Sequence, residues 1–124
     1  MFTKVTQVST TSCFMYNGVI YFAVPKALVS RAIGENGRNI RRLSEIIGKR
    51  ARVVAKPESV LDAKRFVESI VNPLRFNDLQ IVNNEIIITA GSQSKAALIG
   101  RFKRRLEELQ DITKEYFGMD VKII

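Results

Sequence analysis

Apolar and polar residues alternate with two different periodicities along the first part of the chain. Alternation with a period of two predicts β-strands, and spacings of three and four residues predict amphipathic helices. The expected elements are a strand in the opening stretch through Tyr16, a strand over 19–24, helices over 25–33 and 38–47, and a strand over 50–54. Asn17-Gly18 is a strong hairpin signal between the first two strands. The predicted order is strand, strand, helix, glycine turn, helix, strand.

The second part of the chain repeats this order. Its expected elements are a helix from about Pro57 to Val71, strands over 79–82 and 86–89 around Asn83-Asn84, a helix capped by Ser92 or Ser94 that runs through Ile99, a longer helix to Phe117 and a strand over 120–124. The stretch 99–106 aligns with 33–40 at an offset of 66 residues, and the terminal strand aligns with 51–54 after four more residues, about one helical turn. We therefore predict two copies of one unit, at 1–56 and 57–124.

Positive charge is concentrated in the first copy. Residues 1–55 hold nine basic and two acidic residues, a balance of +7, whereas residues 56–124 hold eleven and ten, a balance of +1. A basic field on one side favours a polyanionic partner such as a nucleic acid. The same part contains Gly34 and Gly37, which let one helix end and the next begin close to a ligand, with free N–H groups directed at a phosphate.

Composition excludes several classes of protein. The 124 residues include no histidine and one cysteine, Cys13, so the chain offers neither the commonest general base, an internal disulfide nor a zinc site of thiolates and imidazoles. Acidic residues recur among basic ones at helical spacing, which is typical of a solvated helix face. No apolar run reaches the roughly 20 residues of a membrane span, and the start lacks the apolar core of a signal peptide. We expect a soluble, cytoplasmic protein that is not an enzyme and uses no cofactor or metal.

The motif Ile33-Gly34-x-x-Gly37-x-x-Ile40, set between two helices and two strands, resembles the KH domain, whose G-x-x-G loop clamps the backbone of about four nucleotides of single-stranded nucleic acid. The strand pair ahead of the motif is similar to the type II arrangement. Two such copies in tandem resemble the archaeal NusA-like transcription factors over nearly the whole chain.

This resemblance implies an α+β fold of two tandem type II KH domains, at 1–56 and 57–124, each a three-stranded sheet covered by helices on one face. It also implies a protein that binds single-stranded RNA and takes part in transcription termination or antitermination. RNA polymerase or other transcription factors would be further partners, without a membrane or a small-molecule substrate.

Carried over to matching positions, the resemblance implies one complete RNA site in the first copy. Its residues are Ile33, Gly34, Glu35, Asn36, Gly37, Arg38, Ile40, Arg41, Arg42 and Arg52. The two glycines shape the turn, backbone N–H groups near Asn36 to Arg38 contact phosphate, and the three helical arginines add affinity rather than sequence reading. Val29 and the two isoleucines either line a groove for bases or belong to the ordinary core, and the strand 52–54 offers backbone groups and the Arg52 side chain to base edges. Glu35 departs from the family, because a carboxylate beside a phosphate is unfavourable.

The second copy departs further, because Lys103 replaces the second glycine of its loop. A second, degenerate RNA site would consist of Gly100, Arg101, Phe102, Lys103 and Arg104. The basic side chains can hold phosphate, or the copy can serve mainly to pack against the first and extend its surface, which is the role we favour. Phe102 can be an exposed stacking platform or can tuck inward.

Two other functions stay open. A helix pair around a turn is compatible with a helix-turn-helix that binds duplex DNA, although the strands directly before and after the pair argue against it. The protein can also be a scaffold that binds polymerase or the ribosome through a sheet. An apolar patch on the exposed face of that sheet is expected in this case.

Overall fold

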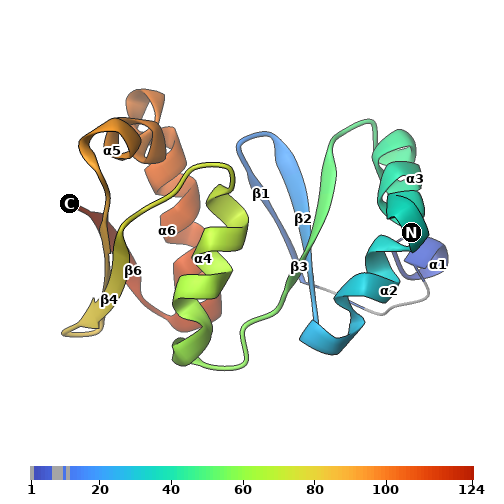
Figure 1. The fold of residues 1–124 in the computed structure, drawn as a ribbon, viewed down its shortest axis with the longest axis horizontal. Helices are drawn as coiled ribbons and strands as arrows, with labels where there is room; N and C mark the ends of the chain where they lie inside the picture. Colours follow the sequence, from blue (N-terminus) through green and yellow to red (C-terminus); the bar gives the residue numbers. More distant parts are fainter. Residues whose placement is uncertain (1, 7–9, 11) are drawn as a thin grey trace. The chain divides into compact units, whose positions relative to one another are not determined.

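The protein has an α+β fold built from two three-stranded sheets (Figure 1). The computed structural model describes residues 2–6, 10 and 12–124. The chain folds into two compact units, Met1–Lys56 and Pro57–Ile124, which we call unit 1 and unit 2. No helix in the described residues is long and apolar enough to cross a membrane. The predicted α+β class is confirmed.

Unit 1 is a sheet covered by helices on one face (Figure 1). Its elements are α1 (Phe2–Thr6), β1 (Cys13–Tyr16), β2 (Val19–Val24), the 3₁₀ turn η1 (Lys26–Leu28), α2 (Val29–Ile33), the 3₁₀ turn η2 (Glu35–Gly37), α3 (Arg38–Ile47) and β3 (Ala51–Ala55). The central strand β2 is antiparallel to β1 and parallel to β3. Phe22 and Val24 of β2 form a buried cluster with Ala32 of α2 and Leu43 of α3. The sheet therefore packs against both helices that flank the glycine loop.

The N-terminal segment differs from the predicted strand, because Cys13–Tyr16 pair in the sheet whereas the described residues Phe2–Thr6 of the same stretch do not. Residues 7–9 and 11 lie outside the described residues. Phe2–Thr6 form a helix in which the Phe2 ring stacks on Phe22 with 4.4 Å between centroids. The buried Thr6 hydroxyl donates to the Phe2 carbonyl at 2.9 Å. Burying one aromatic ring contributes ~1.5–3 kcal/mol, which outweighs the modest strand preference of valine and threonine.

Unit 2 repeats this arrangement. Its elements are the 3₁₀ turn η3 (Val60–Asp62), α4 (Ala63–Val71), β4 (Asp78–Val82), β5 (Glu85–Thr89), α5 (Ser92–Ile99), the 3₁₀ turn η4 (Arg101–Lys103), α6 (Arg104–Phe117) and β6 (Asp120–Ile123). The central strand β5 is antiparallel to β4 and parallel to β6. The first helix begins later than predicted, because Ser59 accepts a hydrogen bond from the Leu61 N–H and caps it there. Gly91 rather than a serine is the N-cap of α5.

The strand registers show that the sequence repeat is also a structural repeat. Ile20 pairs with Ala51 in unit 1, and Ile86 pairs with Val121 in unit 2. The α3 helix has 10 residues and α6 has 14. One extra helical turn in α6 therefore accounts for the shift of four residues between the two copies.

Candidate nucleic-acid interface

The turn of unit 1 depends on Gly34. This residue has φ 82° and ψ 165°, a conformation that L-residues other than glycine rarely adopt. A Cβ at this position would lie 2.8 Å from Cγ of Asn39 and 3.0 Å from its backbone nitrogen. The Asn39 side chain in turn donates to the Arg31 carbonyl at 3.2 Å, near the end of α2. Asn39 thus connects α3 to α2 across Gly34. The sequence shows a small polar residue at this position of the motif but does not indicate this role.

Gly37 has a different role. Its φ of 74° and ψ of 18° are left-handed, and a Cβ there would meet no atom within 4 Å. The Gly37 N–H donates to the Gly34 carbonyl at 3.1 Å, and the Arg38 N–H donates to the Glu35 carbonyl. Two of the backbone donors predicted to contact phosphate are therefore used inside the loop. A ligand would first meet the exposed side chains of Glu35, Asn36 and Arg38.

The three predicted arginines of α3 share its solvent side. Arg38, Arg41 and Arg42 are exposed, whereas Leu43 is fully buried in the core. The ion pairs found among the described residues all lie in unit 2. Unit 1 holds ten basic and two acidic residues and unit 2 holds ten of each, so the whole excess of +8 belongs to unit 1. The arginines consequently keep a strong attraction for anions.

A groove of about 420 Å³ lies beside these arginines, between α3 and β3. It is lined by Ile40, Arg41, Ser44, Glu45, Arg50, Ala51 and Arg52. The Ala51 N–H donates to Ser44 Oγ at 3.1 Å and joins strand to helix at its base. The Arg50 carbonyl and the Lys56 N–H, one at each end of β3, both hydrogen-bond to β2. Because the direction of the backbone groups alternates from residue to residue along a strand, those of Val53 point away from β2, toward the free edge of β3. The groove thus has an apolar wall, a basic rim and a strand edge.

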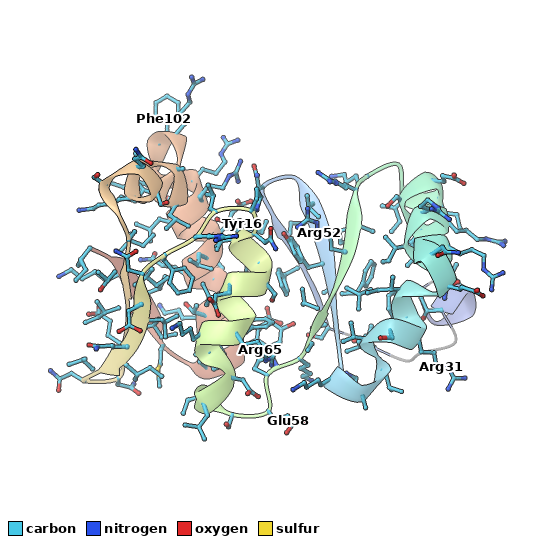
Figure 2. The ribbon with its side chains drawn as sticks, viewed as in Figure 1. Tyr16, Arg31, Arg52, Glu58, Arg65 and Phe102 are labelled. Carbon is cyan, nitrogen blue, oxygen red and sulfur yellow. The ribbon has the colours of Figure 1, made fainter. Side chains whose placement is uncertain are left out.

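The remaining predicted residues have partly structural roles. Val29 and Ile40 are half-buried and pack on the core cluster, and Ile33 is also half-buried. Arg52 lies on β3 (Figure 2) and hydrogen-bonds to the Tyr21 hydroxyl. Burial raises the pKa of Tyr21, and the charge and hydrogen bond of Arg52 act in the opposite direction. One donor of Arg52 is therefore used within the protein.

The loop of unit 2 has the same backbone conformation despite its different sequence. The φ/ψ pairs of Gly100, Phe102 and Lys103 are 78°/171°, 57°/27° and 60°/21°, against 82°/165°, 55°/28° and 74°/18° at Gly34, Asn36 and Gly37. Lys103 keeps the left-handed conformation of the glycine that it replaces, at a cost of ~1–2 kcal/mol. Loss of the second glycine has changed the surface of the loop and not its path.

The helix behind the second loop differs in charge. At the offset of 66 residues, Arg41 and Arg42 correspond to Glu107 and Glu108. Glu108 pairs with Arg105, which lies where unit 1 has Asn39. The helix face that attracts anions in unit 1 is therefore partly acidic in unit 2, a difference that the sequence alignment already contained.

The strained lysine gives a stability prediction. Replacing Lys103 with glycine should stabilise the protein by about 1 kcal/mol, because glycine adopts positive φ without steric cost. Lys95→Gly, inside α5, is the matched control and should destabilise it by about 0.5–1 kcal/mol. Urea unfolding followed by circular dichroism measures both. Equal losses for the two variants would contradict the left-handed conformation at Lys103.

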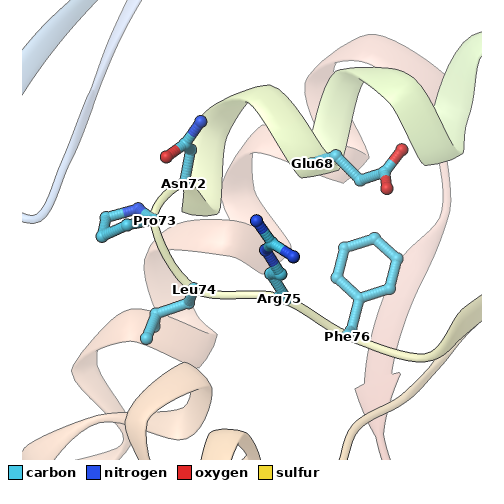
Figure 3. Close-up of a pocket in the computed structure, with 6 residues that line it drawn as sticks. All are labelled: Glu68, Asn72, Pro73, Leu74, Arg75 and Phe76. Carbon is cyan, nitrogen blue, oxygen red and sulfur yellow. The ribbon is translucent and has the colours of Figure 1, made fainter.

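A second hollow, of about 390 Å³, lies in unit 2 after α4 (Figure 3). Its lining residues are Glu68, Asn72, Pro73, Leu74, Arg75 and Phe76. None of the residues predicted from the sequence to bind RNA lines it. Among the described residues, no three histidine, cysteine, aspartate or glutamate side chains come together in a group that could hold a metal ion.

Two archaeal proteins are similar to the chain along nearly its whole length. The probable transcription termination protein NusA of Methanocaldococcus jannaschii is 24% identical over 119 residues, which cover 93% of this chain and 63% of that protein. The protein of the same name from Methanococcus vannielii is 22% identical, over 100% of this chain and 73% of its own length. The chain is similar to archaeal NusA proteins. This confirms the predicted NusA-like resemblance, and the chain spans less than two thirds of the first NusA relative.

The fold has a solved counterpart. The crystal structure of APE1850 matches with a TM-score of 0.68 and 25% identity, covering 99% of this chain and 92% of that one. No protein-family model matches the chain. The NusA-like character therefore depends on the two relatives, and the architecture is shared with APE1850.

Proposed function

We propose that the protein binds single-stranded RNA through unit 1 and acts, without catalysis, as a cytoplasmic NusA-like factor in transcription termination or antitermination. The observation that carries this proposal is the set of three exposed arginines without carboxylate partners in the described structure, placed beside a glycine loop and an open groove. The names of the two NusA relatives support the cellular role. RNA polymerase and other transcription factors are partners within the same proposal.

On this proposal each unit is a type II KH domain, at 1–56 and 57–124. The support is the order of elements around each loop. In both units a helix, the loop and a second helix connect two parallel neighbouring strands, with an antiparallel strand on the other side of the central one. The backbone edge of β3 would then contact bases, and the arginines of α3 would contact phosphates.

A single strand fits this surface better than duplex DNA. A recognition helix must project into a major groove about 12 Å wide, whereas α3 is joined along its side to β3 by the Ser44–Ala51 hydrogen bond. The groove beside α3 has room for unstacked bases next to a free strand edge. Competition of single-stranded RNA, single-stranded DNA and duplex DNA for the protein tests the assignment, and preference for the duplex would overturn it.

The scaffold alternative has less support. It predicts an apolar patch on the exposed face of a sheet. Among the described residues, the exposed large apolar side chains on strands are Met15 on β1 of unit 1 and two neighbours, Ile81 and Val82, on β4 of unit 2. Neighbouring residues of a strand point to opposite faces of the sheet, so these two side chains do not form one patch.

The salt dependence of binding is a direct test of phosphate contact. With three or four phosphates neutralised by unit 1, we expect this unit to contribute about −2 to −3 to the slope of log K against log salt, or roughly a 20- to 50-fold loss between 50 and 200 mM. Fluorescence anisotropy with a labelled polyuridine strand measures it. Arg38→Gln should reduce the slope by about 0.7. A flat response of the unmodified protein would refute contact with phosphates.

A further inference from the structure

Phe102 is the most unusual residue of the second loop. Its side chain is 85% exposed at the tip of η4 and points away from the helices of unit 2 (Figure 2). Its φ of 57° is uncommon for a bulky residue. Because an exposed ring gains none of the free energy of burial, neither packing nor backbone preference accounts for a phenylalanine here. The inward orientation that the sequence left open is not the one observed.

Positive charge surrounds this ring. Arg101, Lys103 and Arg104 are exposed, and no carboxylate pairs with them in the described part of the chain. The loop 101–104 thus carries a charge of +3, whereas the corresponding loop 35–38 has one acidic and one basic residue. Unit 2 is neutral as a whole, with ten basic and ten acidic residues. Its attraction for anions is therefore focused on the loop.

We propose that the loop 101–104 is a second contact for single-stranded nucleic acid, in which Phe102 stacks on an unpaired base and the adjacent cations hold the flanking phosphates. This inference rests on the proposed function of unit 1. Stacking on aromatic rings inside a basic groove or loop is a general way of binding single strands with little sequence preference. Glu107 and Glu108 repel phosphate along α6, so the strand contacts the loop and does not continue along the helix as it would in unit 1.

The structure provides a substitution that removes the ring and keeps the loop. Asn36 has the same backbone conformation in unit 1 as Phe102 has in unit 2. Asparagine also tolerates positive φ well. Phe102→Asn should therefore fold like the unmodified protein, and Phe102→Trp retains an aromatic face at the same position.

Anisotropy of the full chain with labelled polyuridine RNA tests the site. Phe102→Asn should weaken binding by about 5- to 30-fold, the equivalent of ~1–2 kcal/mol, and Phe102→Trp should preserve it. The salt slope should not change for Phe102→Asn, because no cation is lost. Replacing Arg101, Lys103 and Arg104 with glutamine should instead reduce the slope by about 2. After photo-crosslinking, RNA that contains 5-bromouridine should be attached to the peptide that contains Phe102.

The experiments distinguish failure of the second contact at Phe102 from failure of the proposed function of unit 1. If Phe102→Asn binds RNA as tightly as the unmodified protein, while Arg38→Gln weakens binding, the second contact is wrong and the proposed function of unit 1 stands. Such a result would leave the ring available for a protein partner. If the unmodified protein binds no single-stranded RNA, both proposals fail together.

Discussion

Replacing Arg38, Arg41 and Arg42 together with glutamine should lower the affinity for single-stranded RNA by about 100-fold. A hydrogen bond to a charged group contributes ~1.5–3 kcal/mol, and exposure to water and salt reduces this to about 1 kcal/mol for each arginine. Three such contacts give about 3 kcal/mol, or about two orders of magnitude in the dissociation constant. Because the three side chains are exposed and make no ion pair in the described structure, the fold should be unaffected.

The matched control removes the same number of charges from unit 2. Arg75, Lys95 and Lys122 are exposed and lie outside both loops. Their triple glutamine variant should lose less than about threefold in affinity, since separated charges act only through a screened field. Anisotropy gives the affinities, and circular dichroism checks that both variants are folded. Similar losses in the two triple variants would show that net charge rather than the α3 surface binds RNA.

The hairpin turns and the repeat could be predicted from the sequence because their signals do not depend on tertiary packing. Asn17-Gly18 and Asn83-Asn84 have positive φ at all four positions, as tight hairpins require. A constant offset of 66 residues between the copies needs no knowledge of packing. The hairpins depend on backbone preferences that a few neighbouring residues determine, and the repeat is found by comparing the sequence with itself.

Features that depend on distant residues could not be predicted. The Phe2–Thr6 helix exists because Phe2 reaches the core, and nothing in its own five residues indicates this contact. The hydrogen bond from Arg52 to Tyr21 depends on the register of β2 and β3. The use of the Gly37 N–H inside the loop depends on the path of the chain between the two glycines. In each case a partner far from the motif, or an exact backbone path, determines the geometry.

The two loops have the same backbone conformation but present different side chains. They share backbone angles, yet one presents Asn36 in front of an arginine helix and the other presents Phe102 in front of a partly acidic helix. A duplicated scaffold that keeps its backbone can change its side chains independently. We propose that unit 1 holds a single strand in its groove and that unit 2 holds one through the Phe102 ring.

Gly34→Ala should destabilise the protein by about 3–5 kcal/mol, against about 1 kcal/mol for Gly37→Ala. Alanine at position 34 would have to adopt an unfavourable backbone conformation, which costs ~1–3 kcal/mol. Its Cβ would also overlap Asn39, which costs a similar amount. At Gly37 only the left-handed φ is unfavourable, because a Cβ there has open space. Urea unfolding followed by circular dichroism measures the difference, and equal losses would contradict the contact between Gly34 and Asn39.

Asn39 provides an internal control for this prediction. Asn39→Ala removes the side-chain atoms that lie 2.8 and 2.9 Å from the Cβ of a substituted Gly34, but leaves the backbone nitrogen at 3.0 Å. The loss in Gly34→Ala/Asn39→Ala should therefore be smaller than the sum of the single losses, by about 1 kcal/mol. Substituting both glycines with aspartate, an obvious way to remove RNA binding, would thus also strongly destabilise unit 1. The arginine variants are the cleaner test of binding, because they change the charge of the surface and leave Gly34 beneath Asn39.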